Sequence, residues 1–509
     1  MAEKRLAEGF AATACGMLRG DCLPGGVKRF LGIPYGAPTW GENRWRPPQP
    51  PQGWLGTRYA GAWGPIAPQG APDDENTLES YRSEDCLYLN VWTPAHDTGD
   101  RLPVFFFIHG GAYMGGSSGQ LYEGASLAAT GMVVVTLNYR LGILGFFAHP
   151  ELSAESEAGV SGNYGLYDQI LALKWVQDNI AAFGGDPQKV TIGGQSAGGG
   201  SVLSLMASPL ARGLFRGAAV ESGLFNPTFY RPRSLAQQEA GGEAFARRLG
   251  AGSLRHLRAA SVAQLLSCPW DPQTYPDAYT PMTLSPIVDG VLLPEPVEDA
   301  IAHGASREVS LIIGSNSDEF ATLYNPEEPF SFQRYADKLK ACFGLTPGEV
   351  RALYPDETDL DRMHTLIRLE SDEMLAMNLR LAASRAENGA APTYVYYFSH
   401  PIPHDKADFY GAPHSCELPY LFGNRDTGAA NPWDSRPWVA WDETMQRLFQ
   451  LWWYHFTASG SPNGPGLPPW AAYEPGQETL LHIADPVRSE ANPRKQYTKL
   501  LGQKKGERG

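Results

Sequence analysis

The residues best suited to chemistry lie in the segment KVTIGGQSAGGGSVLSLMAS, residues 189–208. It holds the pentapeptide GQSAG, centred on Ser196, between a β-branched run and an apolar run of helical length. A serine on so tight a strand-to-helix turn needs small neighbours, and its hydroxyl then projects from the end of the sheet. The helix N-terminus favours developing negative charge. The pattern predicts Ser196 as a nucleophile; the competing interpretation is a glycine-rich turn with a bystander serine.

A nucleophilic serine needs a base, and the base needs an acid that orients it. In hydrolases that use this turn, the chain order is serine, acid, histidine. Downstream of Ser196, the strand-like VSLII leads into the polar turn GSNSDEF, which contains Asp318 and Glu319. Spacing does not choose between these two acids. Six histidines follow, at 364, 400, 404, 414, 455 and 482, and His414, in the loop GAPHSCELPYLFG after TYVYYF, is favoured only modestly over His400 and His404.

The third requirement is a set of backbone N–H groups directed at the negative oxygen of the reaction intermediate. VFFFIHGGAYMGG, residues 104–116, ends a strand-like run and supplies Gly110, Gly111 and Ala112. Ala197, directly after the serine, supplies another N–H group. A glycine-rich turn after a strand is usually only a turn, but the serine motif downstream favours the functional interpretation here.

A scaffold of alternating strands and helices is predicted to position these segments. Strand-like runs occupy residues 104–108, 133–137, 190–192, 309–313 and 393–398, and helical segments separate them. Continuous apolar strands between helices indicate an α/β fold with a large, mostly parallel sheet covered on both faces. The clearest helix is expected between Asn163 and Phe183. The first hundred or so residues, rich in Pro, Gly and Trp, are expected to form short antiparallel strands and long loops.

One domain is expected over residues 1–501, with capping insertions at about 224–308, which looks irregular, and 321–391, which looks mainly helical. Residues 502–509 are expected to be a flexible tail. With 41 basic and 55 acidic residues the net charge is −14, which argues against nucleic acid or an anionic membrane as a partner. There is no signal-peptide pattern, no apolar stretch of membrane-spanning length, and no metal-ligand spacing among six scattered cysteines. A cytoplasmic protein is therefore expected.

The sequence resembles the type-B carboxylesterases, the carboxylesterase/cholinesterase family of α/β-hydrolases, and most of all their bacterial para-nitrobenzyl-esterase branch. The resemblance rests on motifs in the family's order from residue 30 to the C-terminal region. They are FLGIPYGAP, SEDCLYLNVWTP, HGGAYMGG, NYRLGILGF, GNYGLYDQILALKWVQDNIAAFGGDP, GGQSAGG, ESG, SNSDEF and GAPHSCELPYLFG. So long an ordered series is specific, and it implies the α/β-hydrolase fold.

The resemblance also assigns roles. It implies Ser196 as nucleophile, Glu319 as the acid and His414 as the base. The oxyanion donors would be the backbone N–H groups of Gly111, Ala112 and Ala197, and the Ser222 hydroxyl would lie beside the triad. Two internal ion pairs are implied as structural features, Arg44 with Glu84 and Arg140 with Asp168.

The sequence departs from the family pattern at three places. Ala67 stands near the position where the family has a cysteine that pairs with Cys86, so Cys86 is expected to be a free thiol. The loop between these residues contains no Trp, the side chain with which cholinesterases hold the choline cation, so dedicated choline esters are disfavoured. His414 is followed by Ser415 where glycine is usual, which could tilt the loop without removing the base.

The implied activity is hydrolysis of small to medium carboxylic esters through an acyl-enzyme, with a small-molecule ester and water as partners and neither cofactor nor metal. Oligomeric state is left open. Two alternatives remain: a lipase-like hydrolase of longer acyl chains, disfavoured because no apolar lid is evident, and a non-catalytic binding protein of the same fold, disfavoured because all three triad residues are present. Amides or carbamates are possible side substrates.

Overall fold

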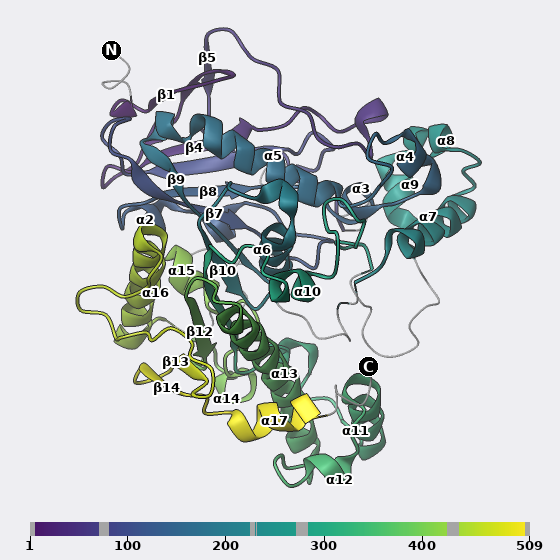
Figure 1. The fold of residues 1–509 in the computed structure, drawn as a ribbon, viewed down its shortest axis with the longest axis vertical. Coiled ribbons are helices and arrows are strands. Elements are labelled where there is room, and N and C mark those ends of the chain that lie inside the picture. Colours follow the sequence, from purple (N-terminus) through teal and green to yellow (C-terminus); the bar gives the residue numbers. More distant parts are fainter. Residues whose placement is uncertain are drawn as a thin grey trace.

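The computed structural model describes residues 6–70, 81–223, 230, 232–270, 283–424 and 437–503. At its centre lies an eleven-stranded sheet with the order β14-β13-β12-β11-β10-β9-β7-β8-β6-β4-β3 (Figure 1). The block from β13 to β8 is parallel throughout, and antiparallel pairs complete both edges. The predicted α/β class with a mostly parallel sheet is confirmed.

The strands of this sheet lie close to the apolar runs of the sequence. Their bounds are β3 Asp21–Cys22, β4 Lys28–Pro34, β6 Tyr88–Thr93, β7 Leu102–Ile108, β8 Val133–Leu137, β9 Gly185–Gln195, β10 Gly217–Glu221, β11 Ser310–Asn316, β12 Thr393–Phe398, β13 Thr479–Ile483 and β14 Arg488–Ala491. A small second sheet contains β1 Phe10–Thr13, β2 Gly16–Arg19 and β5 Thr57–Tyr59. The predicted short strands before residue 100 are therefore confirmed, although β2 and β5 pair in parallel.

Helices cover both faces of the large sheet because alternate side chains of each central strand point to opposite sides. Phe106 of β7 packs in one apolar cluster with α5 (Tyr164–Asn179) and α6 (Ala197–Ala207). Phe105, on the opposite face of β7, packs with α16 (Ala440–Ser459). The helix predicted between Asn163 and Phe183 is confirmed as α5 followed by a 3₁₀ turn.

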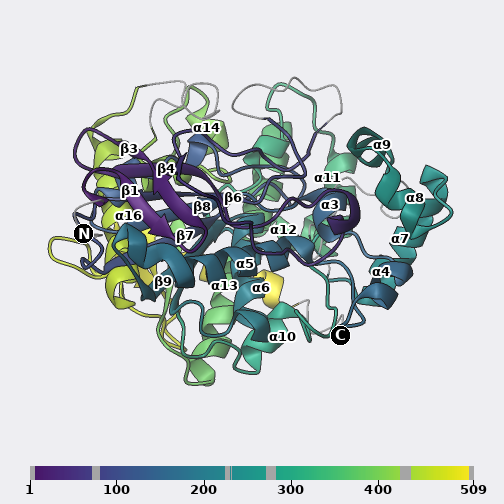
Figure 2. The ribbon, with the colours of Figure 1, turned by 90° about the horizontal axis from the view of Figure 1, so that it is seen from above.

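Both predicted insertions contain helices. The first holds α7 (Leu235–Leu249), α8 (Leu254–Ala259), α9 (Val262–Ser267) and α10 (Val297–Ala302), so the expectation of irregular structure there is wrong. The second holds α11 (Phe332–Lys338), α12 (Pro347–Val350) and all of α13 (Asp359–Glu387), as expected. Helices α7, α8 and α9 gather at one end of the molecule (Figure 2).

The remaining helices are short, apart from the C-terminal one. They are α2 Ala125–Ala128, α3 Gly142–Phe146, α4 Pro150–Glu155, α14 Ala407–Tyr410, α15 Leu418–Phe422 and α17 Lys495–Gln503. The predicted tail, 502–509, lies outside the described residues beyond Gln503. In the described ranges, no helix combines the length and apolar character needed to cross a bilayer.

Candidate active site

Ser196 lies between the last residue of β9 and the first residue of α6, on a sharply strained turn. Its φ of 58° and ψ of −128° lie outside the regions that L-residues ordinarily adopt. Small neighbours make the turn possible: a Cβ on Gly198 would stand 2.0 Å from the carbonyl oxygen of Ile108. The Ser196 N–H group donates to the carbonyl of Glu221 at 2.8 Å, which ties the turn to β10. This is the strand–turn–helix context predicted for a nucleophile.

The loop after β12 and the turn after β11 bring His414 and Glu319 together. Nδ1 of His414 lies 2.6 Å from Oε2 of Glu319, and the His414 N–H group donates to the Glu319 carbonyl at 2.9 Å. Glu319 is fully buried, and its Oε1 accepts hydrogen bonds from the Ser222 hydroxyl at 2.6 Å and the Asn316 N–H group at 2.7 Å. The Ser371 hydroxyl on α13 accepts from the Glu319 N–H group. The carboxylate is therefore held from three directions.

Asp318, the other acid of the turn, faces a different set of partners. Its carboxylate pairs with Arg368 at 3.0 Å and accepts hydrogen bonds from the Ala412 N–H group at 3.0 Å and the Ser317 hydroxyl at 2.5 Å. None of these contacts involves an imidazole ring. The structure thus separates two adjacent acids that spacing in the sequence leaves equivalent.

The electrostatic surroundings of His414 favour its protonated form. Burial lowers the pKa of this imidazole, but the charge of Glu319 and the hydrogen bond to it raise the pKa by more, and Glu417 raises it further. The net direction is upward from the ordinary histidine value. Because a carboxylate only accepts hydrogen bonds, Glu319 also keeps the proton on Nδ1 and leaves the lone pair on Nε2. The ring lies nearly parallel to Phe320, at a centroid distance of 6.1 Å.

The side chain of Gln195 contacts the second ring nitrogen of His414. Its Nε2 lies 3.1 Å from Nε2 of His414, and Gln195 is buried. Among the described residues, no hydrogen bond joins the Ser196 hydroxyl to His414. Catalytic contacts of this kind are often loose without substrate and tighten when it binds. No sequence pattern assigned a role to Gln195, the second residue of GQSAG, so this contact was not predicted.

The three predicted oxyanion donors lie on two turns that approach each other closely. Gly111 and Ala112 adopt φ values of 110° and 55°, and a Cβ on Gly110 would stand 2.9 Å from Cβ of Ser196. In the part of the chain that the structure describes, neither the Gly111 nor the Ala112 N–H group donates to another residue. Ala197 opens α6, where N–H groups lack partners within the helix.

Two further carboxyl groups are buried near Glu319 and His414 and were missed by sequence reasoning. Glu221 ends β10, and Glu417 follows His414 by three residues; both are fully buried. The Asn316 amide donates to Glu417 at 2.6 Å. Burial and the charge of Glu319 raise the pKa of Glu417 to about 7, and burial and Glu417 raise the pKa of Glu221 well above the ordinary value.

The other histidines considered from the sequence serve elsewhere. His400 is buried against Asp442 at 3.0 Å, and His404 caps a short turn through the Lys406 N–H group. His109, at the start of the glycine turn, is buried against Tyr139, and burial lowers its pKa to about 4. Over the described ranges, no group of three or more His, Cys, Asp or Glu side chains is arranged to hold a metal ion.

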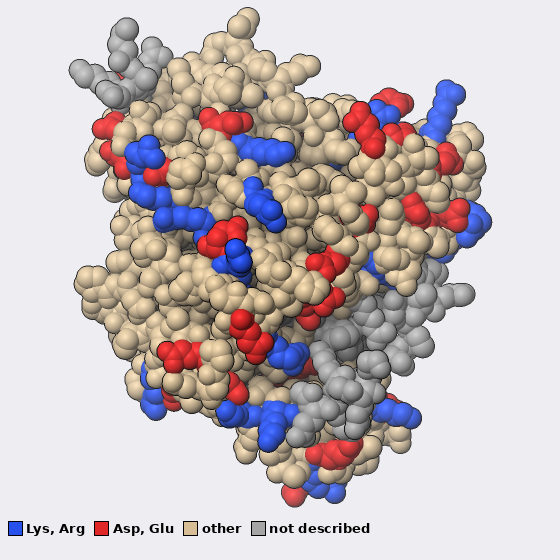
Figure 3. All heavy atoms as spheres, viewed as in Figure 1, with Lys and Arg blue, Asp and Glu red and all other residues tan. Residues whose placement is uncertain are grey.

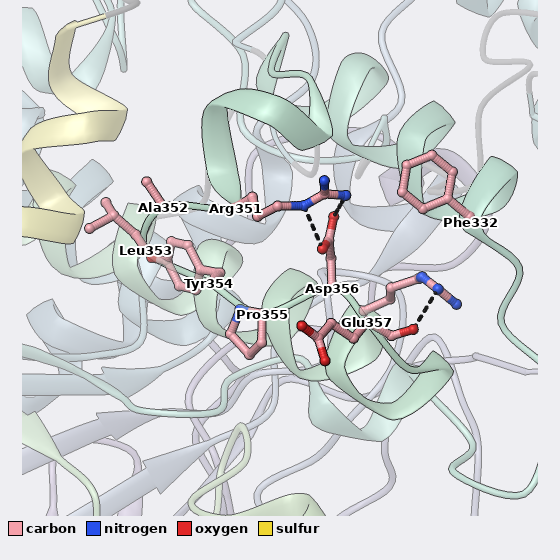
Figure 4. A pocket seen from close by; sticks show the side chains of 9 residues that line it. Phe332, Arg351, Ala352, Leu353, Tyr354, Pro355, Asp356 and Glu357 are labelled. Atoms are coloured by element: carbon pink, nitrogen blue, oxygen red, sulfur yellow. Dashed lines mark hydrogen bonds and ion pairs between the residues drawn. The ribbon is translucent and has the colours of Figure 1, made fainter.

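A surface pocket of about 630 Å³ lies away from these residues, at the base of α11, α12 and α13 (Figure 4). Arg351 and Asp356 face each other across it in a two-point ion pair at 2.9 Å. No predicted site residue lines it. Acidic and basic side chains are interspersed over the face in Figure 3, without a broad basic patch on that side.

The structural expectations attached to the resemblance are also met. Arg44 pairs with Glu84 through two nitrogen atoms, and Arg140 pairs with the fully buried Asp168 at 2.7 Å. Cys86 is buried and free, as predicted from Ala67.

Comparison with known proteins agrees with this architecture. The model of the carboxylesterase family matches residues 7–501. The para-nitrobenzyl esterase of Bacillus subtilis is 37% identical over 501 residues, covering 95% of this chain and 96% of that protein. The fumonisin B1 esterase of Sphingopyxis macrogoltabida is 36% identical over 457 residues, covering 89% and 82%. A carboxylesterase structure from Geobacillus stearothermophilus superposes with a TM-score of 0.81 at 32% identity, covering 97% of this chain and all of that one. The chain belongs to the carboxylesterase family and is a carboxylic ester hydrolase.

Proposed function

We propose that Ser196, Glu319 and His414 hydrolyse small to medium carboxylic esters through an acyl-enzyme on Ser196. The observation that supports this most is the buried Glu319–His414 contact at 2.6 Å beside a serine on a strained strand-to-helix turn. The acid fixes the imidazole tautomer and stabilises the imidazolium that forms during the reaction.

The first half of the cycle forms the acyl-enzyme. His414 Nε2 takes the Ser196 proton as Oγ attacks the ester carbonyl, and the N–H groups of Gly111, Ala112 and Ala197 bind the resulting oxyanion. Each donor of this kind contributes about 3 kcal/mol to lowering the barrier. The alcohol leaves with the proton from His414. A water molecule, deprotonated by His414, then releases the acid and restores Ser196.

Gln195 sets the resting position of the base. Its amide donates to His414 Nε2 at 3.1 Å, so this bond must give way before Nε2 can accept the serine proton. The bond holds the imidazole ring at the correct end of the sheet until substrate arrives. Gln195 is in this proposal a positioning residue and takes no part in proton transfer.

The first test replaces the nucleophile. We expect Ser196→Ala to lose at least about 10³-fold in kcat toward para-nitrophenyl acetate and butyrate while its circular dichroism and melting temperature stay close to those of the parent. A matched control is Ser208→Ala, since Ser208 is also buried but caps the 3₁₀ turn after α6. Full activity in Ser196→Ala would refute the assignment. Comparison with an octanoate ester ranks acyl-chain lengths and separates a carboxylesterase from a lipase.

We further propose that residues 1–501 act as one catalytic domain and that the protein works in a reducing, cytoplasmic compartment. The family match over 7–501 supports the first proposal, and the free thiol of Cys86 supports the second. Thiol titration of denatured protein, purified without reductant, should find all six cysteines reduced.

A further inference from the structure

A second serine–histidine–glutamate chain lies at the edge of the large sheet, outside the site described above. Ser399 directly follows β12, His482 belongs to β13, and Glu490 belongs to β14. The Ser399 hydroxyl lies 2.7 Å from Nε2 of His482, and Nδ1 of His482 lies 2.7 Å from Oε1 of Glu490. Three neighbouring strands therefore align a hydroxyl, an imidazole and a carboxylate.

The direction of the hydrogen bonds follows from the groups themselves. A carboxylate only accepts, so Glu490 keeps the imidazole proton on Nδ1 and leaves the lone pair on Nε2. Ser399 must then donate its O–H to that lone pair. A serine that donates to a base which a third group orients has the arrangement of an activated nucleophile. Here the contact is already made, whereas Ser196 makes no hydrogen bond to His414 among the described residues.

The group is open to solvent and lies beside a cation. The side chains of His482 and Glu490 are 22% and 32% exposed, and Ser399 is half-buried. Arg488 stands directly opposite His482 in the antiparallel β13–β14 pair, and residues so paired share a face of the sheet. Arg488 is exposed and, among the described residues, forms no ion pair. Because β14 lies two strand spacings, about 10 Å, from β12, the long Arg488 side chain would have to extend across β13 to stabilise a negative oxygen that forms next to Ser399.

We propose that Ser399, His482 and Glu490 form a second reactive-serine site, which accepts acyl or phosphonyl groups from small activated esters with Arg488 as the oxyanion partner. Ser399 Oγ attacks the carbonyl carbon, and its proton passes to His482 Nε2. The bond from that carbon to the aryl oxygen then breaks, and the departing oxide takes the proton. With a fluorophosphonate, Ser399 Oγ attacks the phosphorus atom instead, the P–F bond breaks, and fluoride leaves with the proton as hydrogen fluoride. A water molecule, deprotonated by His482, then attacks the acetyl group and releases it as acetate, and Ser399 regains its proton. The cycle needs no oxidant, reductant or metal.

The second site is expected to react more slowly than a site with a full set of backbone donors. The Ser399 N–H group already donates to the carbonyl of Ile483 at 2.9 Å, so it cannot bind the oxyanion. Loss of one such donor lowers a rate by roughly 10²–10³-fold. Strands β9 and β12 are three strand spacings apart, about 14 Å, so each site should react independently of the other.

The test uses the full chain carrying Ser196→Ala, treated with para-nitrophenyl acetate or an aryl fluorophosphonate. Intact mass followed by peptide mapping is expected to show one adduct, on the peptide that contains Ser399. Labelling should be lost in Ser196→Ala/Ser399→Ala. It should fall at least about tenfold when Glu490→Gln is added, because the amide can still accept from Nδ1 but no longer stabilises the imidazolium.

Ser489 provides the matched control, since it lies on β14 between Arg488 and Glu490 and is half-buried like Ser399. Ser489→Ala should leave labelling unchanged, and Arg488→Gln should slow it. Unaltered circular dichroism in the Glu490 and Arg488 variants separates slower chemistry from a disrupted sheet edge. Labelling of Ser399 no faster than that of Ser489, or labelling indifferent to Glu490→Gln, would overturn the proposal. Because Ser196 is absent throughout, failure here leaves the proposed triad unaffected.

Discussion

Asp318 and Glu319 are adjacent in the turn after β11, but their side chains contact different residues. Glu319 faces His414, Ser222 and Asn316, whereas Asp318 faces Arg368 and the loop before His414. Spacing in the sequence could not separate them because the partners that differ most, His414 for Glu319 and Arg368 for Asp318, come from elements far along the chain. The family resemblance chose Glu319, and the geometry supplies a physical reason for that choice.

This difference leads to a paired prediction. Glu319→Gln preserves the shape of the side chain but removes the charge and the tautomer control, so kcat should fall by roughly 10³–10⁴-fold. Asp318→Asn weakens a pair with the partly exposed Arg368 and should cost less than tenfold in kcat. Para-nitrophenyl ester kinetics on the two purified variants decide the matter. Comparable losses in both would place the acid elsewhere in the turn.

The buried Glu417 should affect the pH dependence of the reaction. The base works only when neutral, so kcat/KM should rise with pH through the raised pKa of His414 and then level off. Glu417 is one of the groups that raise this pKa, and Glu417→Gln removes its charge while keeping an oxygen that accepts from Asn316. The pKa of His414 should therefore fall, and the acid limb of the profile should move to lower pH.

Glu221→Gln is the control for this shift, because Glu221 is also buried and its pKa is raised by Glu417, but it is not among the groups that raise the pKa of His414. Its profile should move less than that of Glu417→Gln. An acid limb that stays in place in Glu417→Gln, or moves to higher pH, would show that Glu417 does not interact electrostatically with the base.

At the scale of elements, the turn between β9 and α6 depends on how closely α6 approaches β7. A methyl group on Gly198 would meet backbone oxygen atoms of Ile108 and His109, at 2.0 and 2.8 Å, and backbone cannot move aside as a side chain can. Gly198→Ala should therefore displace Ser196, destabilise the fold by about 1–3 kcal/mol, and reduce kcat. Chemical denaturation and ester kinetics measure the two effects.

Gly348, within α12, gives the opposite expectation, since a methyl group there meets nothing within 4 Å. Gly348→Ala should leave activity unchanged and raise stability by up to about 1 kcal/mol. Equal changes in stability and activity in the two variants would contradict the explanation that the close approach of α6 to β7 requires glycine at position 198.

The predictability of the elements follows from what they bury. Strands β8 and β12 have the predicted bounds because every one of their residues is buried. A fully buried strand appears in the sequence as a continuous apolar run, which is easy to recognise. Helix α7 was missed because its buried residues are Gln238, Gly242, Phe245 and Ala246, which leave little apolar periodicity. The contacts of Gln195 and of Ser399 were missed because they join residues 219 and 83 positions apart.

At the scale of the whole molecule, α13 links the catalytic turn to the C-terminus. Near its middle, Ser371 accepts a hydrogen bond from the Glu319 N–H group, and the next residue, Asp372, binds Arg494 just before α17. Asp372 is buried and also accepts from the Tyr354 hydroxyl at 2.6 Å. The C-terminal helix α17 thus packs beside α13, the helix whose Ser371 holds the backbone of Glu319 (Figure 1).

Breaking this pair should therefore destabilise the fold more than it affects the chemistry. Arg494→Ala leaves the Asp372 carboxylate buried with one neutral donor, and removing one partner of such a pair costs about 3–5 kcal/mol. The midpoint of denaturant unfolding should fall accordingly, with faster hydrogen exchange in α17.

Lys495→Ala is the matched control, because Lys495 begins α17 and pairs with Glu478 while its side chain is 59% exposed. A contact so exposed contributes about 0–1 kcal/mol. Equal midpoints in the two variants would mean that α17 is held by its apolar contacts alone. A loss of kcat in Arg494→Ala well below its unfolding transition would mean that α13 transmits the change to Glu319.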